Sequence, residues 1–181
     1  ELDLKSEEGL NLFKELVAVA DVVVDNFSQG VTKRLGIDHQ SLKKVNSKII
    51  TCSISGFGDT EVNRPAYDNL IQGYAGAMSI TGTDKESPVK SGIPIADLGA
   101  GLYAVIGILS AIQSREKNDS GEHVDISMLD TQVSLLTYMA TMHFLSGENP
   151  EPIGNQHMNH VPFNSYRTLD GFIQIGVVAE D

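Results

Sequence analysis

The chain has 181 residues, of which 41% are hydrophobic and 20% are charged, the balance of an ordinary globular protein. Its net charge of −11 argues against a nucleic-acid binder, which would present a basic face. That charge does not exclude an anionic ligand, because helix N-termini and a few local cations can hold phosphates. The single cysteine, Cys52, excludes an internal disulfide and suits a reducing compartment, so we expect a cytoplasmic protein.

No segment of the sequence is expected to act as a targeting signal or to cross a membrane. The longest apolar-rich run, Leu98 to Ile112, contains glycines and is shorter than the roughly 20 residues that a membrane-spanning helix needs. The chain opens without an initiator Met, and both of its ends read like the interior of structured segments. We therefore expect an internal piece of a longer protein, with room for one core or for one domain and part of another.

The first half of the chain alternates strand and helix patterns. Leu2–Leu4 resembles the end of a strand, and apolar residues at helical spacing predict a helix from Ser6 to Ala20. The β-branched run Asp21–Val24 predicts a strand, Asp38 is the expected N-cap of a helix that ends near Val45, and Lys48–Ser55 predicts a buried strand. This order favours an α/β fold with a Rossmann-like parallel sheet flanked by helices.

A glycine-punctuated segment follows, over residues 56–76, and long irregular segments of this kind are often functional. A helix is expected over Asn69–Met78 and a loop over Thr81–Ser91. The strongest helix prediction comes after Asp97. It combines an apolar stripe with small residues that allow close packing against another backbone: Leu102, Val105, Ile106, Leu109 and Ile112 in the stripe, and Gly99, Ala100, Gly101, Ala104 and Gly107 among the small residues.

The last third of the sequence predicts a strand at His123–Ser127 and one amphipathic helix at Asp130–Leu145. Residues 147–164 are expected to form a loop. Tyr166–Ile175 predicts a hairpin, with Asp170-Gly171 as its turn.

Several common chemistries lack support in the sequence. No dinucleotide-binding glycine fingerprint and no phosphate-binding Gly-Lys-Ser loop occurs. His157 and His160 are three residues apart but have no carboxylate or cysteine neighbours, so no metal site is expected. Cys52 lies within a predicted strand, which favours an inert core thiol over a nucleophile.

Asp97 is the most informative single residue, because it lies between an extended apolar run and a predicted helix. It can cap that helix by accepting a backbone N–H bond in the first turn. It can also be a carboxylate that the positive end of the helix keeps ionised, and so a nucleophile. From the pattern alone, capping is the favoured interpretation.

Two further segments carry both a structural and a functional interpretation. Ser53–Gly58 is either a glycine turn that closes a strand or a set of backbone N–H groups that approach a ligand, and the pattern modestly favours the turn. Asn26-Phe27, followed by Gly30 and Lys33-Arg34, is either a solvated loop or a site at the carboxyl end of a parallel strand, where α/β sheets bind ligands.

The ordered set of these pieces resembles the family III CoA-transferases, of the formyl-CoA and carnitine CoA-transferase type. The resemblance covers essentially the whole chain, and its order makes it specific. The matching segments are Leu2–Lys5, Asp21–Phe27, Arg34–Gly36, Ser53–Gly58, Ala66–Asp68, Ala96-Asp97, Gly101-Leu102, Arg115, Val124–Ser127, His160–Pro162 and Tyr166–Gly171.

The resemblance implies roles for particular residues. Asp97 matches the catalytic aspartate of the family, and three groups match segments that contact CoA: Leu2, Asp3, Leu4 and Lys5; Asn26, Phe27, Ser28 and Arg34; and Ser55, Gly56, Phe57 and Gly58. CoA and acyl-CoA are then substrates, with no permanently bound cofactor and no metal, and the second substrate is a carboxylic acid. Through this resemblance Asp97 becomes the predicted nucleophile, forming an aspartyl anhydride and then an aspartyl-CoA thioester.

Two other functions compete with CoA transfer. Acyl-CoA racemases of the same superfamily carry a His at the position of Tyr67, and a tyrosine is a poor general base near neutral pH, which disfavours racemisation. In the other alternative the protein binds CoA without catalysis and Asp97 only caps its helix.

The resemblance also predicts the domain organisation. Residues 1–146 are expected to form a CoA-binding α/β large domain without its N-terminal part, and residues 147–181 the linker and the beginning of a smaller domain. An intertwined homodimer is expected, and the piece alone is expected to be inactive. The sequence departs from the family at residues 59–65, where a Gly-Pro pair often follows the glycine loop, so the substrate side of the site is expected to differ.

Overall fold

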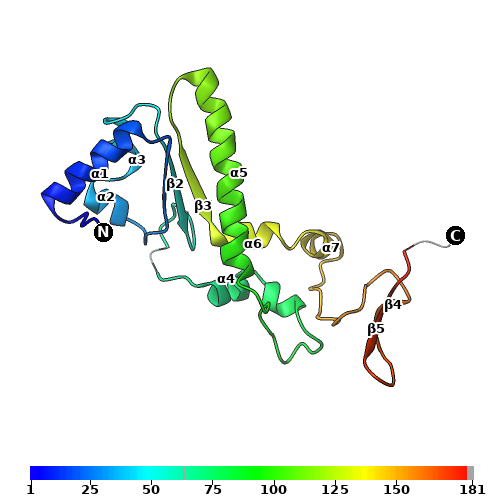
Figure 1. Cartoon of the computed structure of the whole chain (residues 1–181). Coiled ribbons are helices and arrows are strands. Elements are labelled where there is room, and N and C mark those ends of the chain that lie inside the picture. Colours follow the sequence, from blue (N-terminus) through cyan, green and yellow to red (C-terminus); the bar gives the residue numbers. More distant parts are fainter. Residues whose placement is uncertain (63, 179–181) are drawn as a thin grey trace.

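A three-stranded parallel sheet forms the centre of the protein in the computed structural model, which describes residues 1–62 and 64–178. The strands are β1 (Val22–Asp25), β2 (Ile50–Ser55) and β3 (His123–Ser127), and they stand in that order across the sheet. The central strand is in register with both neighbours, through the pairs Ser53–Asp25 and Ser53–Asp125. The predicted α/β fold with a parallel sheet is confirmed (Figure 1).

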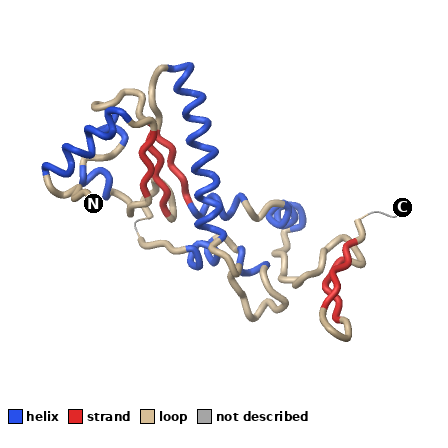
Figure 2. Tube along the Cα trace, in the orientation of Figure 1, coloured by secondary structure: helices blue, strands red, loops and turns tan. Residues whose placement is uncertain are grey.

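Helices lie on both sides of this sheet (Figure 2). On one side are α1 (Glu7–Val19), α2 (Val31–Leu35) and α3 (His39–Lys43). Asp38 caps α3, as predicted, and Ser6, predicted to begin α1, is its N-cap and accepts the Gly9 N–H. A buried cluster holds this side together, made of Val17, Ile37, Leu42 and Ile49.

The other side of the sheet is covered by α5 (Ile95–Asn118), with α4 (Asp68–Tyr74) and α6 (Met128–Ser134) near its N-terminal end. A second buried cluster joins these three helices, made of Ile71, Ala96, Ala100 and Met128. The small residues of α5 allow the predicted close approach. A Cβ added at Gly107 would stand 2.6 Å from Val124 Cγ1 of β3, and one at Gly99 would stand 3.0 Å from Thr131 Cγ2 of α6.

The opposite face of α5 is apolar and exposed, and we call it the outer face of α5. It consists of Leu98, Leu102, Val105, Ile106 and Leu109, each more than half exposed. The whole helix has 24 residues and a window of mean hydropathy 1.9, so by length and composition it could cross a membrane. The apolar run predicted from the sequence, Leu98 to Ile112, is shorter than this helix. Its small-residue face nevertheless packs on β3 and α6, as a layer of the α/β structure.

The C-terminal part extends away from the sheet (Figure 1). It contains α7 (Tyr138–Ser146) and an antiparallel hairpin of β4 (Phe163–Arg167) and β5 (Phe172–Gly176). The predicted turn at Asp170-Gly171 is confirmed, since Thr168 N–H donates to Gly171 O across it. A second domain beginning at residue 147 stays a prediction, and its residues 179–181 lie outside the described residues.

One predicted strand is absent from the described residues, and two predicted helices were wrong in their extent. Leu2–Leu4 is not a strand: the Ser6 N–H donates to Asp3 O, which folds the segment into a turn before α1. The helix predicted over residues 130–145 is two helices, separated where Thr137 takes a φ of 50°. The helix predicted over residues 69–78 ends at Tyr74, and a short 3-10 helix, η1 (Ala77–Ile80), follows Gly76 at a φ of 80°. The helix α2 lies in a segment expected to be a connection.

Candidate functional site

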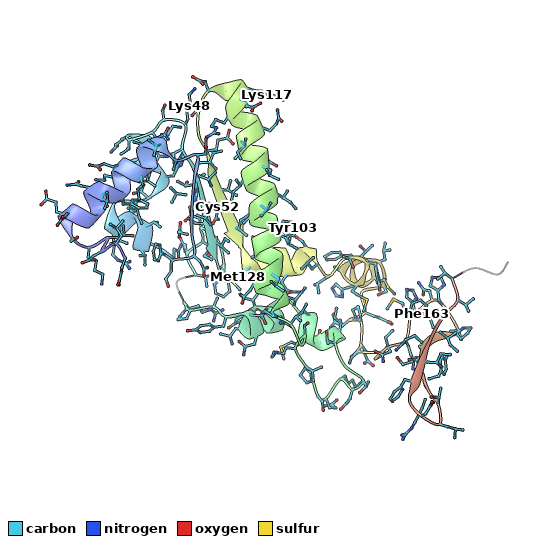
Figure 3. The ribbon with its side chains drawn as sticks, viewed as in Figure 1. Lys48, Cys52, Tyr103, Lys117, Met128 and Phe163 are labelled. Atoms are coloured by element: carbon cyan, nitrogen blue, oxygen red, sulfur yellow. The ribbon has the colours of Figure 1, made fainter. Side chains whose placement is uncertain are left out.

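A cleft of about 750 Å3 opens at the carboxyl ends of the strands, the edge where α/β sheets bind ligands. Its lining comes from the segments that follow β1 and β2, from the start of α4, from the first turns of α5 and from Met128, the first residue of α6. Figure 3 labels Met128, which lies near the N-terminal end of α5. The cleft brings together the following predicted site residues: Asn26, Phe27, Ser28, Ser55, Gly56, Phe57, Gly58 and Asp97.

Asp97 lies inside the first turn of α5 and not before it. The N-cap position belongs to Pro94, which makes no side-chain capping bond. The backbone N–H of the preceding residue, Ala96, donates instead to Asp68 Oδ1 at 2.9 Å. The capping interpretation of Asp97 was therefore wrong, because a different aspartate supplies the capping oxygen. Asp97 is exposed and lines the cleft.

The electrostatic surroundings of Asp97 also differ from the expectation. A helix N-terminus favours the ionised form, and the sequence predicts a carboxylate kept charged in this way. In the structure the pKa of Asp97 is raised above its ordinary value, first by partial desolvation at the cleft and second by the nearby negative charge of Asp68. The side chain is still open to solvent in the cleft.

Asp68 is a functional candidate that the sequence reasoning passed over. It begins α4, and its second oxygen, Oδ2, accepts a 2.6 Å bond from Gln72 Nε2. Gln72 is buried, and its Oε1 accepts the Ser91 N–H at 2.7 Å. The i, i+4 spacing of an acid and an amide was the available signal for the first bond, whereas the contacts with Ser91 and Ala96 are long-range.

The glycine loop after β2 is fixed by side chains of the strand ends. Ser55 Oγ accepts the Gly58 N–H at 3.0 Å, and Asp125 Oδ2 accepts the Asp59 N–H at 2.7 Å. Gly58 has a φ of 68°, and a Cβ there would stand 3.0 Å from Asp125 Oδ2. A Cβ at Gly56 would overlap the Ala66 side chain. These glycines therefore serve the turn and the close packing of the cleft wall, and CoA contact by this loop stays a prediction.

The segment after β1 is held against the end of β2. Asn26 Nδ2 donates to Ile54 O at 2.6 Å, and Ser53 Oγ donates to Asp25 Oδ2 at 2.6 Å. Asp25 Oδ1 also accepts the Phe27 N–H at 3.1 Å. These bonds place Asn26 and Phe27 beside the glycine loop, on one wall of the cleft.

The remaining predicted CoA contacts do not line this cleft. They are Leu2, Asp3, Leu4, Lys5 and Arg34. Leu4 packs against the buried cluster beneath α1, and Asp3 Oδ1 accepts the Lys5 N–H in the turn before that helix. Arg34 lies in the last turn of α2, exposed to solvent. A role for these residues in binding CoA stays a prediction.

Arg64 is a second cleft residue that the sequence reasoning did not single out as a functional candidate. Its guanidinium carbon lies 5.2 Å from the ring centroid of Phe57 and 4.6 Å from that of Tyr74, so two aromatic rings orient one cation. Over residues 1–62 and 64–178, Arg64 forms no ion pair within 4 Å. A fixed guanidinium at the wall of a cleft can bind a carboxylate or a phosphate in a bidentate way.

In the described part of the chain, no three His, Cys, Asp or Glu side chains are grouped so that they could hold a metal ion. His157 and His160 instead lie beside each other, with ring centroids 4.5 Å apart, and His157 also lies 5.2 Å from the ring of Phe163. These rings connect the long loop to the hairpin.

Comparison with known proteins gives matches over nearly the whole chain. The family model described as CoA-transferase family III matches residues 1–181. The chain is 38% identical to a succinate–glutarate CoA-transferase of Agrobacterium fabrum, over 97% of this chain and 44% of that protein. It is 37% identical to an acetyl-CoA:oxalate CoA-transferase of Acetobacter aceti, over 93% of this chain and 44% of that protein.

Solved structures include a similar fold. A CAIB/BAIF family protein from Brucella suis superposes with a TM-score of 0.89 and 40% identity, over 94% of this chain and 46% of that one. The chain thus spans less than half the length of these relatives.

Proposed function

Since this chain belongs to CoA-transferase family III, we propose that it carries the nucleophile and part of the CoA site of an enzyme that moves CoA from an acyl-CoA donor to a carboxylic acid. The observation that carries the proposal is the place of Asp97. Its carboxylate lies in the first turn of α5 at a cleft whose other wall is built by the segments after β1 and β2.

In the proposed chemistry, the Asp97 carboxylate forms a mixed anhydride first with the donor acyl group and later with the acceptor, with an aspartyl-CoA thioester between them. The Asp97 carboxylate attacks the carbonyl carbon of the donor thioester and the C–S bond breaks. This step releases CoA thiolate and forms a mixed anhydride between Asp97 and the acyl group. The thiolate then attacks the Asp97 carbonyl of that anhydride, which releases the donor acid and forms an aspartyl-CoA thioester. The acceptor carboxylate attacks this thioester and expels the thiolate, which finally attacks the acceptor carbonyl and restores the Asp97 carboxylate.

The residues around Asp97 are compatible with this sequence of steps. Gly101, one turn further along α5, also lines the cleft and leaves space beside the carboxylate. Because Asp68 accepts the Ala96 N–H, Asp97 is not needed as the cap of α5, which weakens the alternative of a CoA-binding protein in which Asp97 only caps. The other alternative, an acyl-CoA racemase, is disfavoured by Tyr67, which lines the cleft where such racemases carry a histidine base.

A dicarboxylic acid is the proposed acceptor class. The relatives compared above are named for succinate and glutarate and for oxalate, all of which carry a second carboxylate. In this chain, Arg64 lines the same cleft as Asp97 and is oriented by two rings. One carboxylate of the acceptor would face Asp97 and the other would pair with Arg64, a pairing that a monocarboxylic acid cannot make.

A homodimer is also part of this proposal, with the family resemblance as its support. Light scattering on the full-length protein tests it, and a monomer mass at assay concentrations would contradict it.

The decisive experiment is chemical trapping on the full-length protein during turnover. Hydroxylamine attacks both the anhydride and the thioester, so Asp97 should become a hydroxamate when acyl-CoA and an acid are present, as peptide mass spectrometry would show. Asp97→Asn should show neither the adduct nor transfer. Efficient transfer with no modification of Asp97 would rule out the covalent route.

A further inference from the structure

Asp68 connects α4 to the start of α5 with both of its oxygens. Oδ1 accepts the Ala96 N–H at 2.9 Å, and Oδ2 accepts Gln72 Nε2 at 2.6 Å. Gln72 in turn accepts the Ser91 N–H at 2.7 Å through Oε1. Two side chains of α4 therefore hold the segment that leads into α5 at both of its ends, Ser91 and Ala96.

This arrangement fixes the backbone directly before the nucleophile. Ala96 is fully buried, so its N–H has no access to water and needs a partner within the protein. Pro94, at the N-cap position, offers no side-chain oxygen, and Asp68 replaces it from another helix. Because Asp97 is the next residue, a shift of the Ala96 peptide moves its carboxylate.

We propose that Asp68 is the positioning residue of Asp97: it holds the first turn of α5 through Ala96 and places a fixed negative charge beside the reacting carboxylate, an inference that rests on the proposed CoA transfer. Asp68 makes no bond to the substrate in this role. It acts through the backbone of Ala96 and through its charge.

The charge of Asp68 is the second cause of the raised pKa of Asp97, after partial desolvation. The other titratable or charged side chains that line the cleft are Tyr67 and Arg64, both from the segment just before α4. A carboxylate of higher pKa is the stronger nucleophile in its ionised form. Asp68 therefore affects both the place and the reactivity of Asp97.

An exchange of the two α4 side chains separates these effects. In Asp68→Asn/Gln72→Glu, the amide that replaces the Asp68 carboxylate still accepts the Ala96 N–H and donates to residue 72, and the new carboxylate at position 72 still accepts the Ser91 N–H. The three hydrogen bonds and the formal charge are kept, and the carboxylate moves from position 68, which lines the cleft, to position 72, which does not. Asp68→Ala removes both bonds and the charge. Asp130→Asn, in the first turn of α6 and outside the cleft, is the matched control.

The full-length protein should give three results. Asp68→Ala should lose about 10- to 100-fold in kcat with little change in the KM for acyl-CoA, the usual range for a lost orienting partner. The exchange variant should recover most of kcat, and its acidic limb of kcat/KM should move to lower pH. The control should match the unsubstituted protein in both.

Amide hydrogen exchange of the peptide around Ser91–Leu98 gives a readout that does not depend on activity. Its protection should fall in Asp68→Ala and return in the exchange variant. If the unsubstituted protein transfers no CoA while these exchange differences appear, the proposed function fails and the positioning contact stands. An exchange variant that melts normally but keeps the low kcat of Asp68→Ala and an unmoved pH limb overturns the inference, as does an Asp68→Ala variant with unchanged kcat and protection.

Discussion

Asp68 Oδ1 accepts the backbone N–H of Ala96 at 2.9 Å, and this bond is the capping interaction of α5. The bond comes from a residue 28 positions earlier in the chain and from a different helix. It leaves the carboxylate of the adjacent Asp97 available to the cleft. Asp97 therefore has no capping bond to give up if it acts as the proposed nucleophile.

The pH dependence of transfer should report the surroundings of Asp97. In the proposed mechanism the Asp97 carboxylate attacks only when ionised, so kcat/KM should fall as the pH falls through its pKa. Because desolvation and Asp68 raise that pKa, the fall should begin at higher pH than for an ordinary aspartate. The measurement is kcat/KM for acyl-CoA across the acidic range, with stability checked at each pH. An acidic limb at or below the ordinary aspartate value would contradict this expectation.

Arg64 should discriminate between acceptor acids. In Arg64→Met the cation is lost, and the KM for a dicarboxylic acid should rise about tenfold, equivalent to about 1.4 kcal/mol, while the KM for a monocarboxylic acid should change little. Arg64→Lys keeps the charge without the planar fork and should fall between the two.

The matched control for this series is the KM for the acyl-CoA donor. If Arg64 pairs with a CoA phosphate instead, the donor KM rises in Arg64→Met and the preference between acids stays unchanged. Isothermal titration of CoA into both proteins separates these outcomes.

Two glycines of α5 should respond differently to the same substitution. Ala is favoured over Gly in a helix by about 1 kcal/mol. At Gly101 an added Cβ meets nothing within 4 Å, so Gly101→Ala should raise the free energy of unfolding. At Gly107 the Cβ would stand 2.6 Å from Val124 Cγ1 on β3, and overpacking of this kind costs about 1–3 kcal/mol.

Gly107→Ala should therefore be neutral to destabilising, by up to about 2 kcal/mol. Urea unfolding of the full-length protein measures both variants. Val124→Ala removes the methyl groups that the new Cβ would meet. Gly107→Ala should therefore lower the free energy of unfolding less in the Val124→Ala background than in the unsubstituted protein, a non-additive result expected of residues in contact. Strictly additive losses would show that the clash does not determine the effect.

Local sequence patterns predicted most elements because their causes are local. Ser6 and Asp38 cap their own helices, and the β-branched run before Asp25 forms β1. The failures have non-local causes. The capping oxygen of α5 comes from Asp68 on another helix, and Arg64 is oriented by Phe57 and Tyr74 from separate elements, so neither contact has a signature in the residues next to it.

The structure brings part of the predicted site residues together, and their roles stay predictions. The segments after β1 and β2 and the start of α5 meet at one cleft because parallel strands end at the same edge of the sheet. The break at Thr137 was missed because its φ of 50° follows no glycine or proline signal. The close packing of small residues on α5 was predicted, and Gly99 packs against α6 and Gly107 against β3. The exposure of the larger apolar residues of the same helix was not predicted.

The thiol of Cys52 should be unreactive in the folded protein. It lies in the middle of β2 (Figure 3) and is fully buried. Burial, followed by the charges of Asp25 and Asp125, raises its pKa to about 11. At pH 8 only about one thiol in a thousand would then be ionised, and the thiolate is the reactive form. A disulfide exchange reagent should leave the native protein unmodified at this residue and label it fully after urea unfolding, with peptide mass spectrometry assigning the site.

Cys52→Ala should keep CoA transfer, since the proposed route uses the Asp97 carboxylate and no thiol of the protein. Rapid labelling of the native protein at Cys52, or loss of transfer in a well-folded Cys52→Ala variant, would instead place a second nucleophile in the sheet.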